Sequence, residues 1–352
     1  ERLFSIDEFR HSKSLKALFF VILMLMLSFI VVHVYTLDAT IQDAVYKTSI
    51  CWPHFQNCES LYFLSFVNWG ISKSLFFGIL FLLIMYSAVS AYQGNWVTAH
   101  FCLLIVALWR FFLFFFLTYK IPSAFEYYCL SIAFIVLLSP NKLLFSRWCF
   151  CFLYFLAATV KFHDGWLVGT YFTSHKLGMP LISDSLAPIA SQLVIGLEIV
   201  ASWTLLSRNS KIRMFSVYIW LAFHFYSILV VGLVYPSNCV PILLCLFAIN
   251  EPSDHKIFYR PQHFFSLAIF GLLVLVHLVP YKIGGDIKYT LEGYKYGVGM
   301  IDANHQCVNE ATVHYRGGLL EPRDFESPFG HSRCSIYSIW YDLKRLCGEE
   351  DV

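Results

Sequence analysis

The sequence predicts an all-α polytopic membrane bundle of about nine transmembrane helices, followed by a small C-terminal β-rich extramembrane domain. Three observations indicate this fold class. Of the 352 residues, 58% are hydrophobic and 14% are charged, which is too apolar for an ordinary soluble domain of this length. Mostly apolar stretches long enough to cross a bilayer recur along the chain. From Asp286 onward the composition turns polar, with β-forming residues in alternation.

The chain divides into three parts by this pattern. We expect a cytoplasmic N-terminal segment over residues 1–16, a transmembrane bundle over 17–283 and a small non-cytoplasmic β-rich tail over 284–352. The eighth expected span is short and begins near Pro236 and Pro241, so a re-entrant or broken helix is an alternative there. The expected spans lie approximately at 17–36, 71–92, 97–118, 122–139, 145–160, 187–206, 215–234, 237–250 and 263–281.

Orientation follows from Lys and Arg residues in short connections, which resist translocation. Four of them near the start place the N-terminus in the cytoplasm: Arg2, Arg10, Lys13 and Lys16. With an odd number of crossings, the loops 37–70 and 161–186 and everything after Pro280 face the lumen, periplasm or extracellular space. The net charge of +2 is spread over short loops, which excludes a nucleic-acid-binding face.

The cysteines predict disulfides on the non-cytoplasmic side. Cys51 and Cys58 lie in the first outer loop, and the tail carries Cys307, Cys334 and Cys347. We expect a bridge between Cys51 and Cys58 and one bond in the tail, which leaves one cysteine unpaired unless Cys239 joins it. Metal ligation is disfavoured because no His lies at zinc-like spacing. Packing is the expected role of the cysteines within spans: Cys102, Cys129, Cys149, Cys151 and Cys245.

The tail alternates polar and β-forming residues over 306–315 and then reads Arg316, Gly317 and Gly318. This pattern predicts a hairpin that closes at the glycines. A tail of this size buries only a modest core, so we expect it to lean on the bundle or on disulfides.

Ionisable residues inside spans oppose insertion by about 2.5–3.5 kcal/mol each, so they tend to face the bundle interior. Arg110 and Glu126 lie at compatible depths for an ion pair, which is either a structural bridge or part of a functional site. Glu198, with Gly196 and Ser202 nearby to allow close helix approach, is either ligand-facing or packed and hydrogen-bonded. The full set of candidates is His100, Arg110, Glu126, Glu198, His224 and His277.

Lys161 follows the fifth expected span, with His163, Asp164 and Trp166 close behind. Chemistry alone favours a snorkelling anchor whose ammonium reaches lipid headgroups. The alternative is a desolvated lysine that acts as a base near neutral pH. His224 is flanked by Phe223 and Phe225, which is more typical of a satisfied core histidine than of a catalyst.

Several of these segments together resemble the vitamin K-dependent gamma-carboxylase family, whose membrane half is the HTTM (horizontally transferred transmembrane) domain. The residues that carry the resemblance are Lys161 through Trp166 to Tyr171, Phe223 with His224, and Gly293, Tyr294, Tyr296, Met300, His305, Gln306, Tyr315 and Arg316. The resemblance implies that Lys161 is the base that deprotonates a vitamin K-like quinol. It implies that His224 belongs to the catalytic set. Candidate ligand-binding residues are then Glu198, Arg110, Glu126 and Trp166.

Two readings of function follow from the sequence. The first is a short carboxylase-like enzyme that binds a quinol or another lipid between its helices. The second is a non-catalytic membrane subunit that docks lipids, partner helices or a non-cytoplasmic protein. It is favoured by residues 123–127, which hold no His where the family has an Asn-Asn-His segment, and by a tail too short for a complete carboxylase. A transporter is disfavoured because we find no internal repeat.

Overall fold

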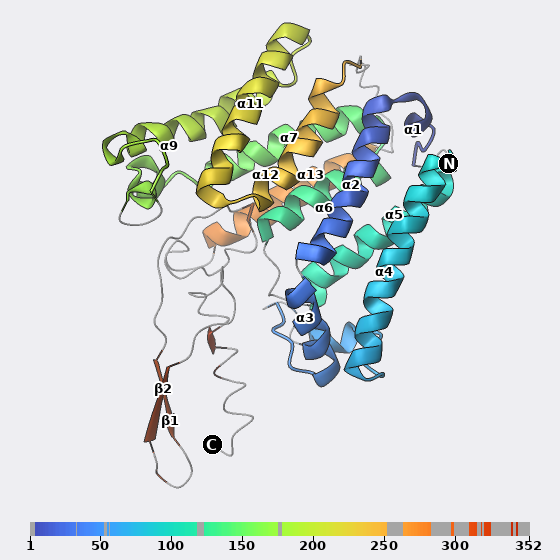
Figure 1. Cartoon of the computed structure of the whole chain (residues 1–352), viewed down its shortest axis with the longest axis vertical. Coiled ribbons are helices and arrows are strands. Elements are labelled where there is room, and N and C mark those ends of the chain that lie inside the picture. The colour runs from blue at the N-terminus through green and yellow to red at the C-terminus, as the bar shows by residue number, and fades with distance from the viewer. Residues whose placement is uncertain are drawn as a thin grey trace.

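A computed structural model describes most of the chain and gathers its helices into one bundle (Figure 1). The described residues are 4–32, 34–52, 55, 57–117, 123–174, 178–251, 263–282, 297–298, 310–314, 318, 320–324, 339–340 and 343.

The first third of the chain forms one side of the bundle, and its α2 packs against the central helices. Its elements are α1 (Glu8–His11), α2 (Lys13–Val32), α3 (Val34–Tyr46), the 3₁₀ turn η1 (Cys58–Leu61), α4 (Trp69–Tyr92), α5 (Trp96–Phe112) and the π-helical turn η2 (Leu113–Leu117). Asparagine side chains accept a hydrogen bond from the first turn of α4 and of α5, at Asn68 and Asn95, and such caps define where these helices begin.

The remaining helices form the centre and the opposite edge. They are α6 (Ser123–Leu138), α7 (Lys142–Thr159), α8 (Asp164–Leu167), the 3₁₀ turns η3 (Thr170–Phe172) and η4 (Asp184–Leu186), α9 (Ala187–Gly196), the π-helical turn η5 (Leu197–Ala201), α10 (Ser202–Thr204), α11 (Ser210–Val231), α12 (Val234–Leu243), the π-helical turn η6 (Leu244–Ala248), α13 (His263–Leu278) and the 3₁₀ turn η7 (Val279–Lys282).

Seven helical stretches in the described residues are long and apolar enough to cross a membrane, which fits a multi-pass membrane protein. The other two expected spans appear as shorter apolar helices, Glu126–Leu138 and Val234–Ala248. The first stretch begins at Lys13, so the expected boundary between residues 16 and 17 falls inside α2. Pro241 lies inside α12, which runs directly into a π-helical turn, as an irregular eighth span would.

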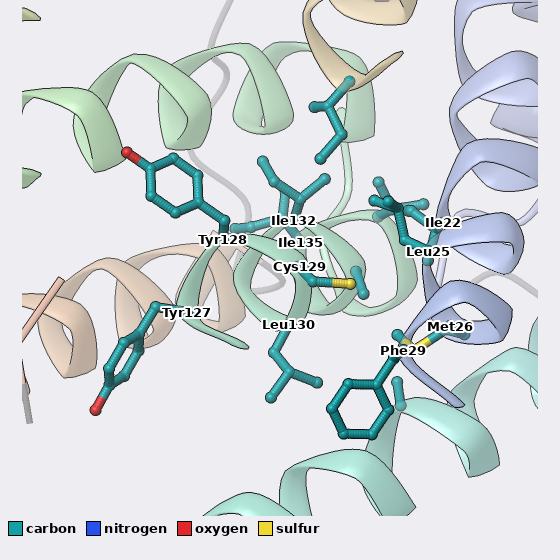
Figure 2. Packing of buried hydrophobic residues seen from close by; sticks show 14 of the residues in the cluster. Ile22, Leu25, Met26, Phe29, Tyr127, Tyr128, Cys129, Leu130, Ile132 and Ile135 are labelled. Carbon is teal, nitrogen blue, oxygen red and sulfur yellow. The ribbon is translucent and has the colours of Figure 1, made fainter. Parts of the chain in front are cut away.

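The core lies around α6 and α7. In α7 the buried share of the span is 78%, against 22–50% for the other six long spans, so α7 is the central helix. Figure 2 shows α2 side chains, among them Leu25, Met26 and Phe29, gathered beside the α6 residue Cys129, whose sulfur points toward α2. This packing brings α2, α5 and α6 together at the depth of Arg110.

The expectation of a small C-terminal β-rich domain is wrong. In the part of the tail that the structure describes, only β1 (Glu310–His314) and β2 (Leu320–Asp324) pair, with Glu310 opposite Asp324 and His314 opposite Leu320. Two strands cannot form a β-rich domain with a core of its own. The alternating pattern predicted local strand character, but alternation does not specify partner strands. Residues 306–309 and 315–317 of the predicted hairpin lie outside the described residues.

Candidate functional site

Lys161 lies just past the end of α7 and its side chain turns back into the bundle. Its Nζ donates a hydrogen bond to the carbonyl oxygen of Ala157 at 3.2 Å and forms an ion pair with Glu198 Oε2. The two side chains are 1% and 0% exposed. A snorkelling anchor would keep its ammonium in the headgroup region, so the anchor interpretation is wrong.

Trp166, on α8, covers the lysine, with Lys161 Nζ 5.1 Å from the centre of its ring. The chain after α8 returns to α9 through Gly169, whose φ is +71°. A Cβ at this position would lie 2.6 Å from the backbone nitrogen of Pro188, so only glycine fits this close approach. Gly169 therefore holds the segment that carries Trp166 against the helix leading to Glu198.

Glu198 lies in the π-helical turn η5, a local irregularity that is frequent at functional sites. Its Oε1 is buried and has no hydrogen-bond partner among the described residues. The expected close approach occurs at Ser202, whose carbonyl accepts from the Cys151 thiol at 3.0 Å, and not at Gly196, where a Cβ would meet nothing within 4 Å. Glu198 is thus half satisfied: one oxygen pairs with Lys161 and the other faces no described donor.

His224, on α11, is fully buried, and its Nε2 lies 2.7 Å from the hydroxyl of Tyr154 on α7. Its Nδ1 has no hydrogen-bond partner among the described residues. Tyr154 precedes Lys161 by seven residues, about 10 Å of helix. His224 and Lys161 therefore belong to one interior region, but no direct contact joins them in the described structure.

Two further tyrosines, which sequence reasoning missed, lie between the two groups. The rings of Tyr128 on α6 and Tyr235 on α12 are 6.2 Å apart, and the Tyr128 ring is 5.6 Å from that of Tyr154. Tyr128 and Tyr235 interact electrostatically with Glu198. A tyrosine inside an apolar span was the available signal, because a buried phenol needs a polar neighbour.

Arg110 and Glu126 form the ion pair that their depth predicted. Arg110 Nε and Nη2 donate to Glu126 Oε2 and Oε1, both at 2.7 Å, and the side chains are 5% and 1% exposed. The guanidinium also lies 4.0 Å from the centre of the Phe29 ring and donates to the carbonyl oxygen of Leu25 at 3.4 Å. The pair thus joins α5 and α6 to α2, and it forms a site separate from Lys161 and Glu198.

The two remaining candidate histidines have packing environments. His277 Nε2 lies 2.8 Å from the Thr159 hydroxyl and ties α13 to the end of α7. His100 is fully buried beside the Phe4 ring, at 5.4 Å between ring centres, and neither of its nitrogens has a hydrogen-bond partner in the described part of the chain.

The predicted disulfide between Cys51 and Cys58 is confirmed. These sulfurs and Glu59 lie close together, but bridged sulfurs are not thiolate ligands for a metal. Cys239 is a free, buried cysteine, so it does not complete a pair with a described residue. The tail cysteines Cys307, Cys334 and Cys347 lie outside the described residues.

A hollow of about 420 Å³ opens between η1, α4 and α5. Its lining is entirely apolar: Leu61, Phe63, Leu64, Phe76, Ile79, Leu80, Leu83, Ile105, Leu108, Trp109 and Phe112. Lys161, Glu198 and His224 are not among these residues, so the hollow and the buried ion pair are separate features.

The chain matches no family model, no curated protein and no solved structure. The resemblance to the vitamin K-dependent gamma-carboxylases and their HTTM domain therefore stays a prediction, and function has to be argued from the geometry of the site.

Proposed function

We propose that this chain is a multi-pass membrane enzyme of the carboxylase-like kind, in which Lys161 acts as the base on a hydroxyl of a quinol. The observation that carries the proposal is the buried pair of Lys161 and Glu198, with its unsatisfied carboxylate oxygen. Ionisable pairs inside a membrane bundle are costly and mark functional sites by default.

The pair has the chemistry that a base requires. In a dry interior, transfer of one proton from the lysine to Glu198 gives a neutral amine beside a carboxylic acid, which removes two buried charges. The amine then accepts a proton from a ligand hydroxyl, and the ammonium so formed stabilises the oxyanion next to it. In the proposed family, the quinol supplies the reactivity with oxygen that generates a strong base.

Two features of the region fit a hydroxyl-bearing ligand. Glu198 Oε1 and His224 Nδ1 are buried polar atoms without a described partner, and such atoms are rare unless water or a ligand serves them. Aromatic side chains of Trp166, Tyr154 and Tyr235 surround these groups, and flat rings suit a quinone-like headgroup.

The test is quinol turnover by the purified chain in lipid nanodiscs. With vitamin K hydroquinone, oxygen, bicarbonate and a glutamate peptide, we expect quinol oxidation and carboxylation that Lys161→Ala lowers at least a hundredfold, in line with loss of a general base. Glu198→Gln should also lower turnover, because it removes the group that exchanges a proton with the amine.

Lys142 provides the matched control. It is a second buried lysine, at the start of α7, and its Nζ donates to the carbonyl oxygen of Ser139, away from the pair. Lys142→Met should keep turnover per folded molecule, while Lys161→Ala should keep folding and lose turnover. Unchanged turnover in Lys161→Ala would remove the proposed base.

A second candidate function rests on the apolar hollow between α4 and α5. We propose as the alternative a non-catalytic subunit, in which this hollow receives side chains from a transmembrane helix of a partner protein. Its lining includes Ile105 and Leu108, which are 52% and 50% exposed, and side chains of a partner helix packed into the hollow would gain the van der Waals contacts that drive helix association in a bilayer. Purification in mild detergent discriminates the two: a stoichiometric partner that Ile105→Trp displaces supports the subunit, and a lone protein with an extractable quinone supports the enzyme.

A further inference from the structure

Two buried arginines, one near the start of α7 and one near the start of α11, converge on the end of η6 and the residues just after it. Arg147, on α7, is 4% exposed, and Arg213, on α11, is 9% exposed. Arg147 Nε donates to the carbonyl oxygen of Leu246 at 2.7 Å, and Arg213 Nη2 donates to Asn250 Oδ1 at 2.9 Å. Leu246 lies in η6 and Asn250 lies two residues past its last residue, so both guanidiniums meet the end of η6.

The two guanidiniums retain unused donors. Arg147 Nη2 and Arg213 Nε are buried, and neither has a hydrogen-bond partner in the described part of the chain. No carboxylate of the described residues forms an ion pair with either arginine, and the charge of Arg213 acts unfavourably on Arg147. Two buried like charges with spare N–H groups form an arrangement that an anion would stabilise.

Among the described residues, the acid that interacts with Arg147 does not fill this role. Glu251 interacts electrostatically with Arg147, but its oxygens serve the start of α2. Oε1 accepts from the backbone amides of Lys13 and Ser14 at 2.5 and 3.2 Å, and Oε2 accepts from the Ser12 hydroxyl at 2.6 Å. The carboxylate is therefore bound to a helix N-terminus and leaves the arginines unbridged.

A purely structural role explains only part of the arrangement. Cations at a helix C-terminus interact favourably with its free carbonyls, which accounts for the Arg147 bond to Leu246 at the end of η6. That role requires one donor from one arginine. Arg213 has structural bonds of its own, from Nη1 to the Ser207 carbonyl oxygen at 3.4 Å and from Nη2 to Asn250. None of these bonds accounts for the two N–H groups without partners.

We propose that Arg147 and Arg213 together bind a phosphate group, supplied by the headgroup of an anionic phospholipid. Planar guanidiniums match phosphate oxygens with paired hydrogen bonds. Arg147 lies five residues into α7, about 7.5 Å from its start, which is the depth of headgroups and not of the bilayer centre. The exposed Arg208 and Lys211, in the loop before α11 and in its first turn, add positive charge that attracts anionic lipid.

The experiment uses the full chain in nanodiscs of phosphatidylcholine with a minor fraction of phosphatidylglycerol. Native mass spectrometry reports which lipid stays bound after release, and thermal unfolding reports stabilisation. For the native chain, we expect phosphatidylglycerol to stay bound and Tm to be higher than in pure phosphatidylcholine. Arg147→Gln combined with Arg213→Gln should weaken retention about tenfold or more. A parallel sample in pure phosphatidylcholine with inorganic phosphate distinguishes a lipid headgroup from free phosphate. If inorganic phosphate raises Tm and phosphatidylglycerol adds nothing further, the two arginines bind free phosphate and the lipid assignment is wrong.

A matched control separates this site from general surface attraction. Arg208→Gln combined with Lys211→Gln removes the same charge from exposed positions and should keep most of the retention. Equal loss in the two double variants, or full retention in the buried double variant, overturns the proposal. If the glutamine variant does not fold, Arg147→Lys and Arg213→Lys keep the charge but lose the paired donors; weaker retention supports the site, and unchanged retention contradicts it.

Discussion

At the scale of single residues, the ion pair between Arg110 and Glu126 is the clearest structural element of the interior. Each guanidinium edge bond is 2.7 Å long and both side chains are buried. Removing one partner leaves the other charged and unpaired, so Arg110→Leu or Glu126→Leu should lower the free energy of unfolding by about 3–5 kcal/mol. Unfolding of the purified chain by denaturing detergent measures this change.

The double variant Arg110→Leu with Glu126→Leu is the informative control. It removes both charges together and leaves apolar side chains of suitable size, so its stability should return close to that of the native chain. If the double variant were as unstable as the sum of the single ones, the pair would not be coupled and the structural role would be wrong.

The sequence predicted this pair from depth alone, and it predicted the bridge between Cys51 and Cys58 from compartment. It did not predict the burial of Lys161, because the side chain of a lysine at the end of a span can extend either to the lipid headgroups or into the bundle. Its direction here depends on Glu198, which is 37 residues away, and on a π-helical turn that no local pattern indicates. Partners that are distant in sequence explain why Tyr128 and Tyr235 were missed as well.

At the scale of secondary-structure elements, α2 is capped by a residue that is distant in sequence. Glu251 follows η6 and accepts hydrogen bonds from the Ser12 hydroxyl and the amides of Lys13 and Ser14. Burial acts to raise the pKa of this carboxyl, but these hydrogen bonds outweigh it, so the pKa lies below its ordinary value. The charged form of Glu251 is therefore the one that the folded state favours.

A pH dependence follows from that direction. A carboxyl with a lowered folded-state pKa contributes stability above its unfolded pKa, and the contribution is lost as pH falls through the folded value. Glu251→Gln should thus destabilise the chain by about 1 kcal/mol at pH 7, as loss of a cap does. At acidic pH, the stability of the Glu251→Gln variant should approach that of the native chain. Thermal unfolding from pH 7 down to pH 3 measures both; a constant difference across this range would contradict the cap.

Hydropathy predicted the positions of most helices but not the residues at which they begin and end. The positions of the expected spans correspond to helices because about 20 apolar residues leave few alternatives. Their boundaries depend on caps such as Asn68, Asn95 and Glu251, and Glu251 belongs to a different part of the chain. The expected first span therefore began four residues late.

At the scale of the whole molecule, α2 determines which face of the membrane each of its flanking segments occupies. Its 20 residues span about 30 Å, the thickness of the hydrocarbon core. α1 precedes it, and α3 with the disulfide-bonded loop comes after it, so we expect these segments on opposite faces of the membrane. In Figure 1, β1 and β2 lie at the end of the molecule opposite to α1. The β-rich tail domain was the part of the architecture that was predicted wrongly, because an alternation of polar and β-forming residues indicates strands but not the sheet that they join.

A disulfide persists only on an oxidising side, so with the bridge between Cys51 and Cys58 we expect its loop outside and α1 in the cytoplasm. Labelling with a membrane-impermeant maleimide in intact cells tests this arrangement. In a background with serine at the three tail cysteines, Gln42→Cys and Glu310→Cys should react without permeabilisation, and Asp7→Cys only after it; all three replaced residues are exposed.

Because the long spans alone number seven in the described chain and the two shorter helices add a pair, either number of crossings is odd. Labelling of positions 7 and 310 from the same side would therefore mean that one of these helices does not cross, and it would move Lys161 or the strand pair to the other face.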